Sequence, residues 1–191
     1  MSMLKRLPPR RRREGLTDYR MRLKLVKSRL PRLVIRKTNR YIIVQVVRCK
    51  EGGDETLLTV TSKKLLKYGW KGGLKNLPAS YLTGLLAGIQ AKKKGIEKAI
   101  VDIGLHKPVK GSRIFAAVKG FIDAGVDVPA GEEIFPDEDR IRGSHISEYY
   151  QRIKEEGLET KQFSKVGDIY EELEKHFDEI KEKILKEAEE A

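Results

Sequence analysis

The sequence predicts an α/β sandwich built on a mixed sheet, preceded by a basic arm and followed by a helical extension. Three strand-like runs lie between residues 32 and 61, two of them rich in β-branched residues. A long apolar helix pattern, a short continuous apolar run and a second helix pattern follow them. Elements in this order are typical of layers packed around one core. We therefore divide the chain into an arm (1–31), an α/β domain (32–128) and a helical C-terminal extension (129–191).

The arm is predicted to be a flexible basic segment followed by a helix. Residues 1–15 contain a Pro-Pro pair, four consecutive arginines and few apolar side chains. Such a segment cannot offset its ordering entropy alone, so we expect it to lack fixed structure until a polyanion orders it. Thr17 or Asp18 can then cap a helix that runs to about Ser28. Residues 21–25 also alternate in polarity as a strand does, and this alternative stays open.

Next come three strands that we expect to form an antiparallel meander. The first two predicted strands are Arg32–Thr38 and Tyr41–Arg48. A two-residue link that contains Asn, here Asn39-Arg40, indicates a hairpin between them. The glycines at 52–53 then turn the chain into a third strand, Thr56–Thr61.

Two helices and one strand complete the predicted domain. Residues 79–93 read as a long, mostly buried helix, and residues 113–124 as a second, amphipathic one. Between them the apolar run 99–103 is typical of an interior strand that is covered on both faces. The spacing of Gly84 and Gly88 favours close packing of the first helix against the sheet over dimerisation in a membrane.

Beyond Pro129 the composition changes and the pattern becomes helical. Pro136 to Asp139 reads as a turn or helix start, and Ser144 can cap a helix. A last helix is expected to begin at Asp168. Its apolar stripe consists of Ile169, Leu173, Phe177, Ile180 and Ile184.

Charge is the strongest compositional signal. The chain of 191 residues carries a formal net charge of +12. Residues 1–50 hold 17 basic and 2 acidic side chains, whereas residues 151–191 hold 8 basic and 13 acidic ones. A protein polarised in this way can lay one end on phosphates and leave its acidic end in solvent or against a basic partner.

Several classes of protein do not fit the composition. The single cysteine, Cys49, excludes an internal disulfide framework and a Cys-rich zinc module, and the three separated histidines make a His-based metal cage improbable. The basic N-terminus lacks the apolar core of a secretory signal. The longest uncharged run, Asn76 to Ala91, is 16 residues, short of the roughly 20 needed to cross a bilayer. We expect a soluble intracellular protein that binds a polyanion.

The arginines at 10–13 are the strongest candidate nucleic-acid site. Guanidinium groups are permanently charged and form paired hydrogen bonds with phosphate oxygens. The predicted helix continues the basic pattern as far as Arg32. A nuclear-targeting or merely solubilising run is the alternative.

Three further segments combine positive charge with aromatic or turn residues. The hairpin turn 37–41 resembles a sheet-based RNA platform, although lysines near a sheet edge also serve only to block aggregation. The stretch Lys67–Gly73 places Trp70 among glycines and basic residues, which fits a loop on which a base stacks and equally a loop anchored in the core. The loop 106–113 enters a helix N-terminus, where free amides and the helix dipole favour a phosphate; an ordinary βα loop is the alternative.

Catalysis is disfavoured because acidic residues do not converge. A metal-dependent nuclease needs several carboxylates around two cations. Asp102 lies in a predicted strand, but the first strand carries no acid, so Asp102 is interpreted as a structural residue. Neither a P-loop nor a G-x-G-x-x-G motif is present.

Four stretches of the sequence together resemble one protein family. They are RRRREGLTDYRMRLKLVKSRLPRLVIRKTNRYIIVQVV, KYGWKGGLKNLPASYLTGLLAG, DIGLHKPVKGSRIFAAVKG and GEEIFPDEDRIRGSHI, and they run in order from about Arg10 to Ile146. On these residues the chain is similar to the large-subunit ribosomal protein L-eighteen family in its archaeal form, which is related to eukaryotic ribosomal protein L-five.

The resemblance implies a three-layer α/β/α fold with ribonuclease-H-like topology and no nuclease activity. It implies a structural constituent of the large ribosomal subunit that binds 5S rRNA and attaches it to the large-subunit rRNA in the central protuberance. The implied partners are these two RNAs and neighbouring large-subunit ribosomal proteins, with no cofactor, metal or membrane, in the cytoplasmic ribosome. The basic arm would contact both RNAs, and the loop 107–113 would face RNA.

Residues and resemblance together give one set of expected RNA contacts. They are Arg10, Arg11, Arg12, Arg13, Tyr19, Arg20, Arg22, Lys24, Lys27, Arg32, Arg36, Lys37, Asn39, Arg40, Tyr41, Tyr68, Trp70, Lys71, His106, Lys107, Lys110, Ser112 and Arg113. Two alternatives to a structural RNA-binding protein remain. One is a ribonuclease-H-like RNA-processing enzyme, and the other is an adaptor that binds proteins through the acidic 168–190 helix.

Overall fold

The computed structural model describes residues 7–157, 163 and 168–190. The strands are β1 (Arg32–Lys37), β2 (Ile42–Lys50), β3 (Gly53–Thr61) and β4 (Ile100–Asp102). The helices are α1 (Arg10–Arg13), α2 (Tyr19–Lys27), α3 (Leu77–Lys93), α4 (Arg113–Asp123), α5 (Glu138–Arg142), α6 (Ser144–Glu155) and α7 (Leu173–Glu190). Three 3₁₀ turns are η1 (Ser62–Tyr68), η2 (Glu132–Ile134) and η3 (Asp168–Tyr170).

The four strands form one mixed sheet in the order β3-β2-β1-β4. β1 pairs antiparallel with β2, β2 pairs antiparallel with β3, and β4 pairs parallel with β1. The turn between β1 and β2 is closed by Thr38, whose Oγ1 accepts hydrogen bonds from the amides of Arg40 and Tyr41. The predicted meander and α/β class are confirmed, and the strand order has the expected ribonuclease-H-like topology.

The position of β4 differs from the prediction. β4 lies at the edge of the sheet, whereas β1 and β2 are the interior strands. Its apolar composition has a local reason: the chain near Asp127 runs alongside it, with the Ala99 amide donating to the Asp127 carbonyl at 3.0 Å. A single parallel bridge joins Lys98 to Asp127, so this segment shields the edge without becoming a strand.

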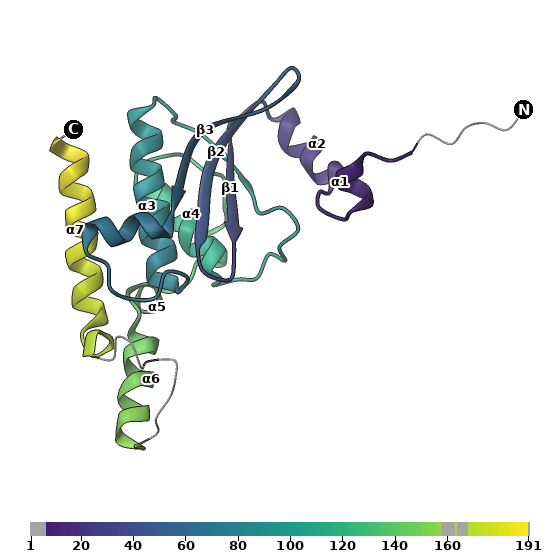
Figure 1. The fold of residues 1–191 in the computed structure, drawn as a ribbon. Coiled ribbons are helices and arrows are strands. Elements are labelled where there is room, and N and C mark those ends of the chain that lie inside the picture. Colours follow the sequence, from purple (N-terminus) through teal and green to yellow (C-terminus); the bar gives the residue numbers. More distant parts are fainter. Residues whose placement is uncertain (1–6, 158–162, 164–167, 191) are drawn as a thin grey trace, which may run out of the picture.

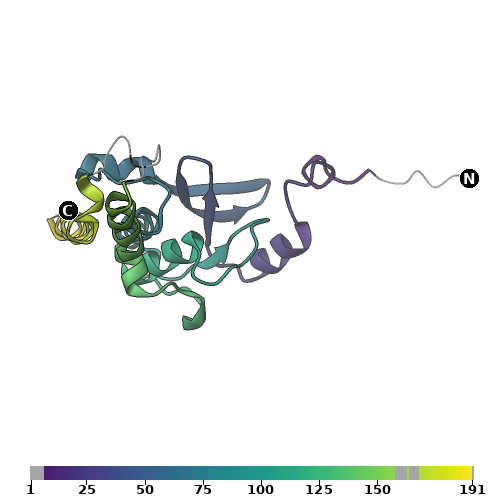
Figure 2. The same ribbon diagram turned by 90° about the horizontal axis from the view of Figure 1, so that it is seen from below.

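Helices lie on both sides of the sheet, but they cover its faces unequally (Figures 1 and 2). α3 packs against β2 and β3, and α4 packs against β1. The strand residues that face these helices, such as Leu33, Ile35 and Val44, are fully buried. On the opposite side lies α2, which buries none of its residues. The third layer of the expected sandwich is therefore thin.

Close contact between α3 and α4 explains the spaced glycines. A Cβ atom at Gly84 would collide with the backbone of Ala117, and one at Gly88 would collide with Phe121 and Ala124. Gly120 of α4 approaches the backbone of Tyr81 in the same way. The predicted close packing exists, but its partner is the second helix and not the sheet. No helix in the described part of the chain is long and apolar enough to cross a membrane.

The arm contains two short helices. Asp18 caps α2, accepting hydrogen bonds from the amides of Arg20 and Met21, so of the two predicted caps it is the one used. We expected residues 1–15 to lack structure alone; in the part that is described, Arg10–Arg13 form a single helical turn. All four arginines are exposed, and the turn has no buried residue.

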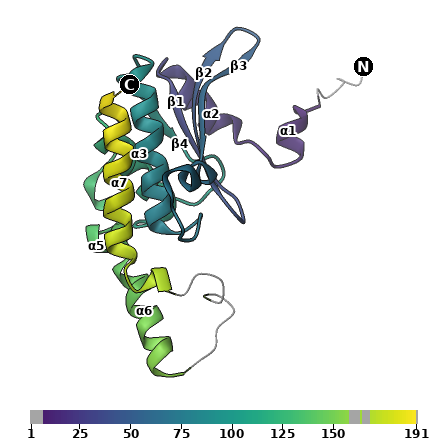
Figure 3. The same ribbon diagram turned by 60° about the vertical axis from the view of Figure 1, so that its left-hand side comes forward.

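The C-terminal helix α7 packs on the body and completes its core. Leu173, Phe177, Ile180 and Ile184 are buried and belong to the same apolar cluster as the sheet and α3. The predicted stripe is confirmed, although α7 begins at Leu173 and η3 precedes it. Figure 3 shows α7 alongside α3, with α6 extending beyond the body. The segment predicted as an extension is thus partly a structural element of the domain.

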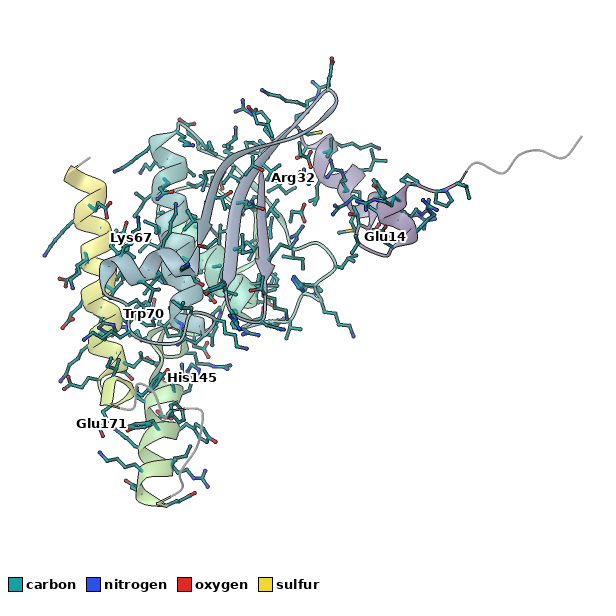
Figure 4. The ribbon with its side chains drawn as sticks, in the orientation of Figure 1. Glu14, Arg32, Lys67, Trp70, His145 and Glu171 are labelled. Carbon is teal, nitrogen blue, oxygen red and sulfur yellow. The ribbon has the colours of Figure 1, made fainter. Side chains whose placement is uncertain are left out.

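Trp70 is a core residue, and the stacking loop predicted for it is wrong. Its side chain is 1% exposed. The indole stacks on His176 of α7, with ring centroids 5.2 Å apart, and its Nε1 donates to the carbonyl of Gly73. Figure 4 shows Trp70 beside α7. The ring cannot receive a base while the helix covers it, so the core-anchor alternative holds.

Replacing Trp70 with Ala should lower the free energy of unfolding by about 3–5 kcal/mol, since a large buried ring is lost and a cavity remains. Urea denaturation measures this loss, and Trp70→Phe should cost less. Unchanged stability in Trp70→Ala would contradict the assignment of this ring to the core.

Candidate nucleic-acid interface

A buried ion-pair network connects the arm, the sheet and the loop after β4. Its centre is Arg32 of β1, which is 3% exposed and lies on the side of the sheet that faces α2 (Figure 4). Arg32 Nη1 lies 2.9 Å from Asp102 Oδ2, and Arg32 Nη2 lies 2.6 Å from Asp54 Oδ2. The two carboxylates come from β4 and β3, so one guanidinium joins three strands.

Asp54 carries the network to the arm. Arg22 of α2 forms a two-pronged pair with this carboxylate, with nitrogen–oxygen distances of 2.7 and 2.9 Å. Burial raises the pKa of Asp54, but hydrogen bonds from Arg22 and Arg32 outweigh this effect and hold the pKa below its ordinary value. The carboxylate is therefore charged at neutral pH, and it fixes α2 although that helix buries no residue of its own.

Asp102 carries the network to the other end of β1. Its Oδ1 accepts from Arg36 Nη2 at 2.8 Å and from the amide of Gly104 at 2.9 Å. Gly104 has a positive φ of 63°, and a Cβ atom there would collide with the Arg36 guanidinium. Asp102 therefore has the structural role that was predicted for it, since its carboxylate orients Arg36 and the backbone at Gly104.

The hairpin turn and the loop after β4 are held close together. Burial lowers the pKa of His106, and repulsion from Lys37 and Arg36 lowers it further. His106 is thus neutral at pH 7, and it lies near Arg36 and Lys37, the cationic residues that end β1. In Figure 1 the loop projects toward the side on which α1 and α2 lie.

A pocket of about 740 Å³ lies where this loop meets the C-terminal helices. Five cationic side chains line it, and no carboxylate of the described residues does. They are Lys37, Lys75, Lys107, Arg113 and Arg140. The pocket therefore has the electrostatic character of an anion site.

Most of the predicted contact residues are exposed, but five are not free surface groups. Arg32 and Trp70 are buried, so a surface contact with RNA through either side chain is excluded in this structure. Arg22 is held by Asp54, and Arg36 is held by Asp102. Tyr68 is half-buried, and burial together with a hydrogen bond to Glu187 raises its pKa.

The remaining predicted residues fall into three exposed or half-buried groups. The arm contributes Arg10, Arg11, Arg12, Arg13, Tyr19, Arg20, Lys24 and Lys27. The hairpin contributes Lys37, Asn39, Arg40 and Tyr41, and the loop contributes His106, Lys107, Lys110, Ser112 and Arg113. Lys71 is exposed near α7, where its amide donates to His176 Nε2.

Two of the five cationic lining residues, Lys75 and Arg140, were absent from the prediction. Lys75 is adjacent to Asn76, the residue that caps α3, and its carbonyl accepts from Arg113 Nη1 at 2.9 Å. The capping pattern could have placed Lys75 at a helix start. Arg140 belongs to α5, and no local sequence pattern indicates that this helix packs on the α/β domain.

Among the described residues, no group of three or more His, Cys, Asp or Glu side chains is arranged to hold a metal ion. Asp102 and Asp54 are occupied by arginines, and Asp123 accepts a hydrogen bond from the Tyr81 hydroxyl at 2.7 Å. These carboxylates have structural partners within the protein.

The mixed sheet, the arginine-rich arm and the cationic pocket have the character of a protein that binds a folded nucleic acid. Comparison with known proteins gives the particular family. The family described as "Ribosomal large subunit proteins 60S L5, and 50S L18" matches residues 5–97 and 88–131. The chain belongs to this family, as the resemblance predicted, and is a protein of the large ribosomal subunit.

Two archaeal relatives match over most of the chain, and both are named large ribosomal subunit protein uL18. The protein from Korarchaeum cryptofilum is 59% identical over 155 residues, which cover 81% of this chain and 80% of the relative. The protein from Methanothermobacter thermautotrophicus is 52% identical over 178 residues, which cover 92% of each chain.

Removing Arg32 should destabilise the protein more than removing Arg36, although both pair with Asp102. Arg32→Met withdraws the charge that two carboxylates share inside the protein, and breaking a buried pair costs about 3–5 kcal/mol. The Arg36 side chain is 37% exposed, so water can replace it in Arg36→Met. Chemical denaturation of the two variants measures the difference, and equal losses would contradict the central role of Arg32.

Proposed function

We propose that the chain binds 5S rRNA and attaches it to the large-subunit rRNA in the central protuberance. The observation that carries the proposal is the distribution of cations: the arm, the hairpin turn and the loop after β4 are basic, while the acidic helix α7 lies at the opposite end of the molecule (Figure 1). Membership of a ribosomal protein family supports an RNA as the polyanion.

Affinity in this proposal comes mainly from neutralised phosphates. Each phosphate contact releases counterions, so binding weakens steeply as salt rises. Specificity comes from the shape of the RNA, because side chains cannot read the deep, narrow groove of an A-form helix. The network of Arg32, Asp54 and Asp102 supports this reading, since it fixes the basic elements relative to one another.

We propose further that the chain has no catalytic role. The described acids that a ribonuclease-H-like enzyme would use for metal binding are paired with arginines or a tyrosine. The adaptor alternative gains no support from α7, because the apolar face of that helix is in the core.

Incubating the purified chain with labelled 5S rRNA and Mg²⁺ separates binding from cleavage. We expect RNA of full length with reduced mobility in a native gel. Shortened RNA would instead support the processing enzyme. If the RNA stays unbound at low salt, just as it does with a neutral control protein, the proposed function is refuted.

Changing Arg10, Arg11, Arg12 and Arg13 together to Gln should weaken 5S rRNA binding. Each lost phosphate contact reduces the slope of log affinity against log salt by about 0.9, a value established for duplex DNA. The melting temperature should stay nearly constant, since the four side chains are exposed.

A matched control removes four exposed cations away from the arm. It carries Lys175→Gln, Lys183→Gln, Lys186→Gln and Arg152→Gln, on α7 and α6. Filter binding at several salt concentrations compares the two proteins, and equal salt slopes would contradict the role of the arm.

A further inference from the structure

The cationic pocket combines elements that are far apart in the sequence. Lys37 comes from the end of β1, Lys107 from the loop after β4, Arg113 from the first turn of α4 and Arg140 from α5. Concentrating these charges costs repulsion, which an anion in the pocket relieves. The pocket volume of about 740 Å³ falls within the roughly 300–1,000 Å³ typical of small-ligand sites.

One wall of the pocket offers donors for a phosphate. The N-terminus of α4 lines the pocket, and Ser112 occupies its capping position. The Ser112 side chain, however, accepts no hydrogen bond from the helix amides. Ser112 Oγ is itself buried and, within the described structure, has no partner. Free amides, the helix dipole and the adjacent Arg113 therefore favour an anion at this wall.

Another part of the lining has the character of a base site. His145 lies there, where α5 meets α6 (Figure 4), and its buried Nδ1 has no partner among the described residues. Burial and repulsion from Arg140 lower the pKa of His145 and outweigh the nearby Glu148, so the ring is neutral at pH 7. A neutral imidazole offers one donor and one acceptor, as base edges require. Tyr170, which is half-buried, adds aromatic surface on which a base can stack, and Phe163, which is 8% exposed, supports the Tyr170 ring edge-on.

We infer that this pocket binds one unpaired nucleotide of the rRNA, with its phosphate at the start of α4 and its base toward His145 and Tyr170. The inference rests on the proposed function and adds a specific contact to it. A concave site of this size admits a single extruded nucleotide, whereas a duplex presents only its backbone to the rim. The C-terminal helices then contribute directly to RNA recognition, since Arg140 and His145 belong to them.

Arg140→Gln tests the pocket, and Arg142→Gln is its matched control. Both arginines are exposed and lie on α5, but only Arg140 lines the pocket. We expect Arg140→Gln to weaken 5S rRNA binding about 5- to 10-fold and to lower the salt slope by about 1. Arg142→Gln should remain within about twofold of the unchanged chain, since it makes no contact in the pocket.

Lys107→Gln is a second test that does not depend on α5 folding correctly. It should behave like Arg140→Gln, since both side chains line the pocket and are exposed. If Arg140→Gln and Lys107→Gln both bind 5S rRNA as Arg142→Gln does, the pocket inference is overturned while the proposed function stands. If the unchanged chain does not bind 5S rRNA at low salt, the proposed function itself has failed.

Chemical probing of the bound RNA identifies the nucleotide. The unchanged chain should protect one or two neighbouring unpaired nucleotides that become reactive again with Arg140→Gln and stay protected with Arg142→Gln. Loss of protection within a base-paired segment would overturn the inference.

A titration with adenosine monophosphate separates RNA from a free nucleotide. Binding of this probe that depends on Arg140, combined with rRNA affinity that does not, would show that the pocket serves a free nucleotide and would overturn the inference.

Discussion

The pairing of Arg32 with Asp102 and Asp54 is the interaction on which the arrangement of the basic surface depends. Placing these groups out of water is costly, and an apolar replacement of a whole buried pair is often no less stable. The main effect of the network is therefore to fix the positions of the basic elements, and its contribution to the free energy of unfolding is secondary. Through Asp54 it holds Arg22 and the arm, and through Asp102 it holds Arg36 and the start of the loop after β4. Arginines thus serve two purposes here, some as surface cations and others as the frame that orients them.

The remaining architecture separates structural packing from RNA-facing charge. α3 and α4 approach through glycines and bury one face of the sheet, which leaves the ends of β1 and the following loops free to carry cations. α7 seals the other side of the helical layer and carries acidic residues on its exposed face. A chain with this polarity presents one orientation to a polyanion, because the opposite orientation is repelled.

Local patterns predicted the elements well, because caps, turns and periodicity act within a few residues. Asp18 and the hairpin turn after Lys37 are examples. Trp70 was ambiguous because its burial depends on His176, more than a hundred residues further along the chain, and no local pattern encodes that contact. Arg32 was mistaken for a surface cation because its partner, Asp102, arrives only when β4 joins the sheet. The sequence could predict that the interface is rich in arginine and lysine. Which of these side chains are exposed, and which are buried in ion pairs, depends on the tertiary structure.

The late position of α7 in the sequence has a consequence for biosynthesis. Phe177, Ile180 and Ile184 close the core over η1 and α3, which are translated well before α7, so the nascent domain keeps an open apolar flank until α7 emerges. The arginine-rich segment leaves the exit tunnel before α7 does. Its cations are therefore available to a polyanion while the core of the domain is still incomplete.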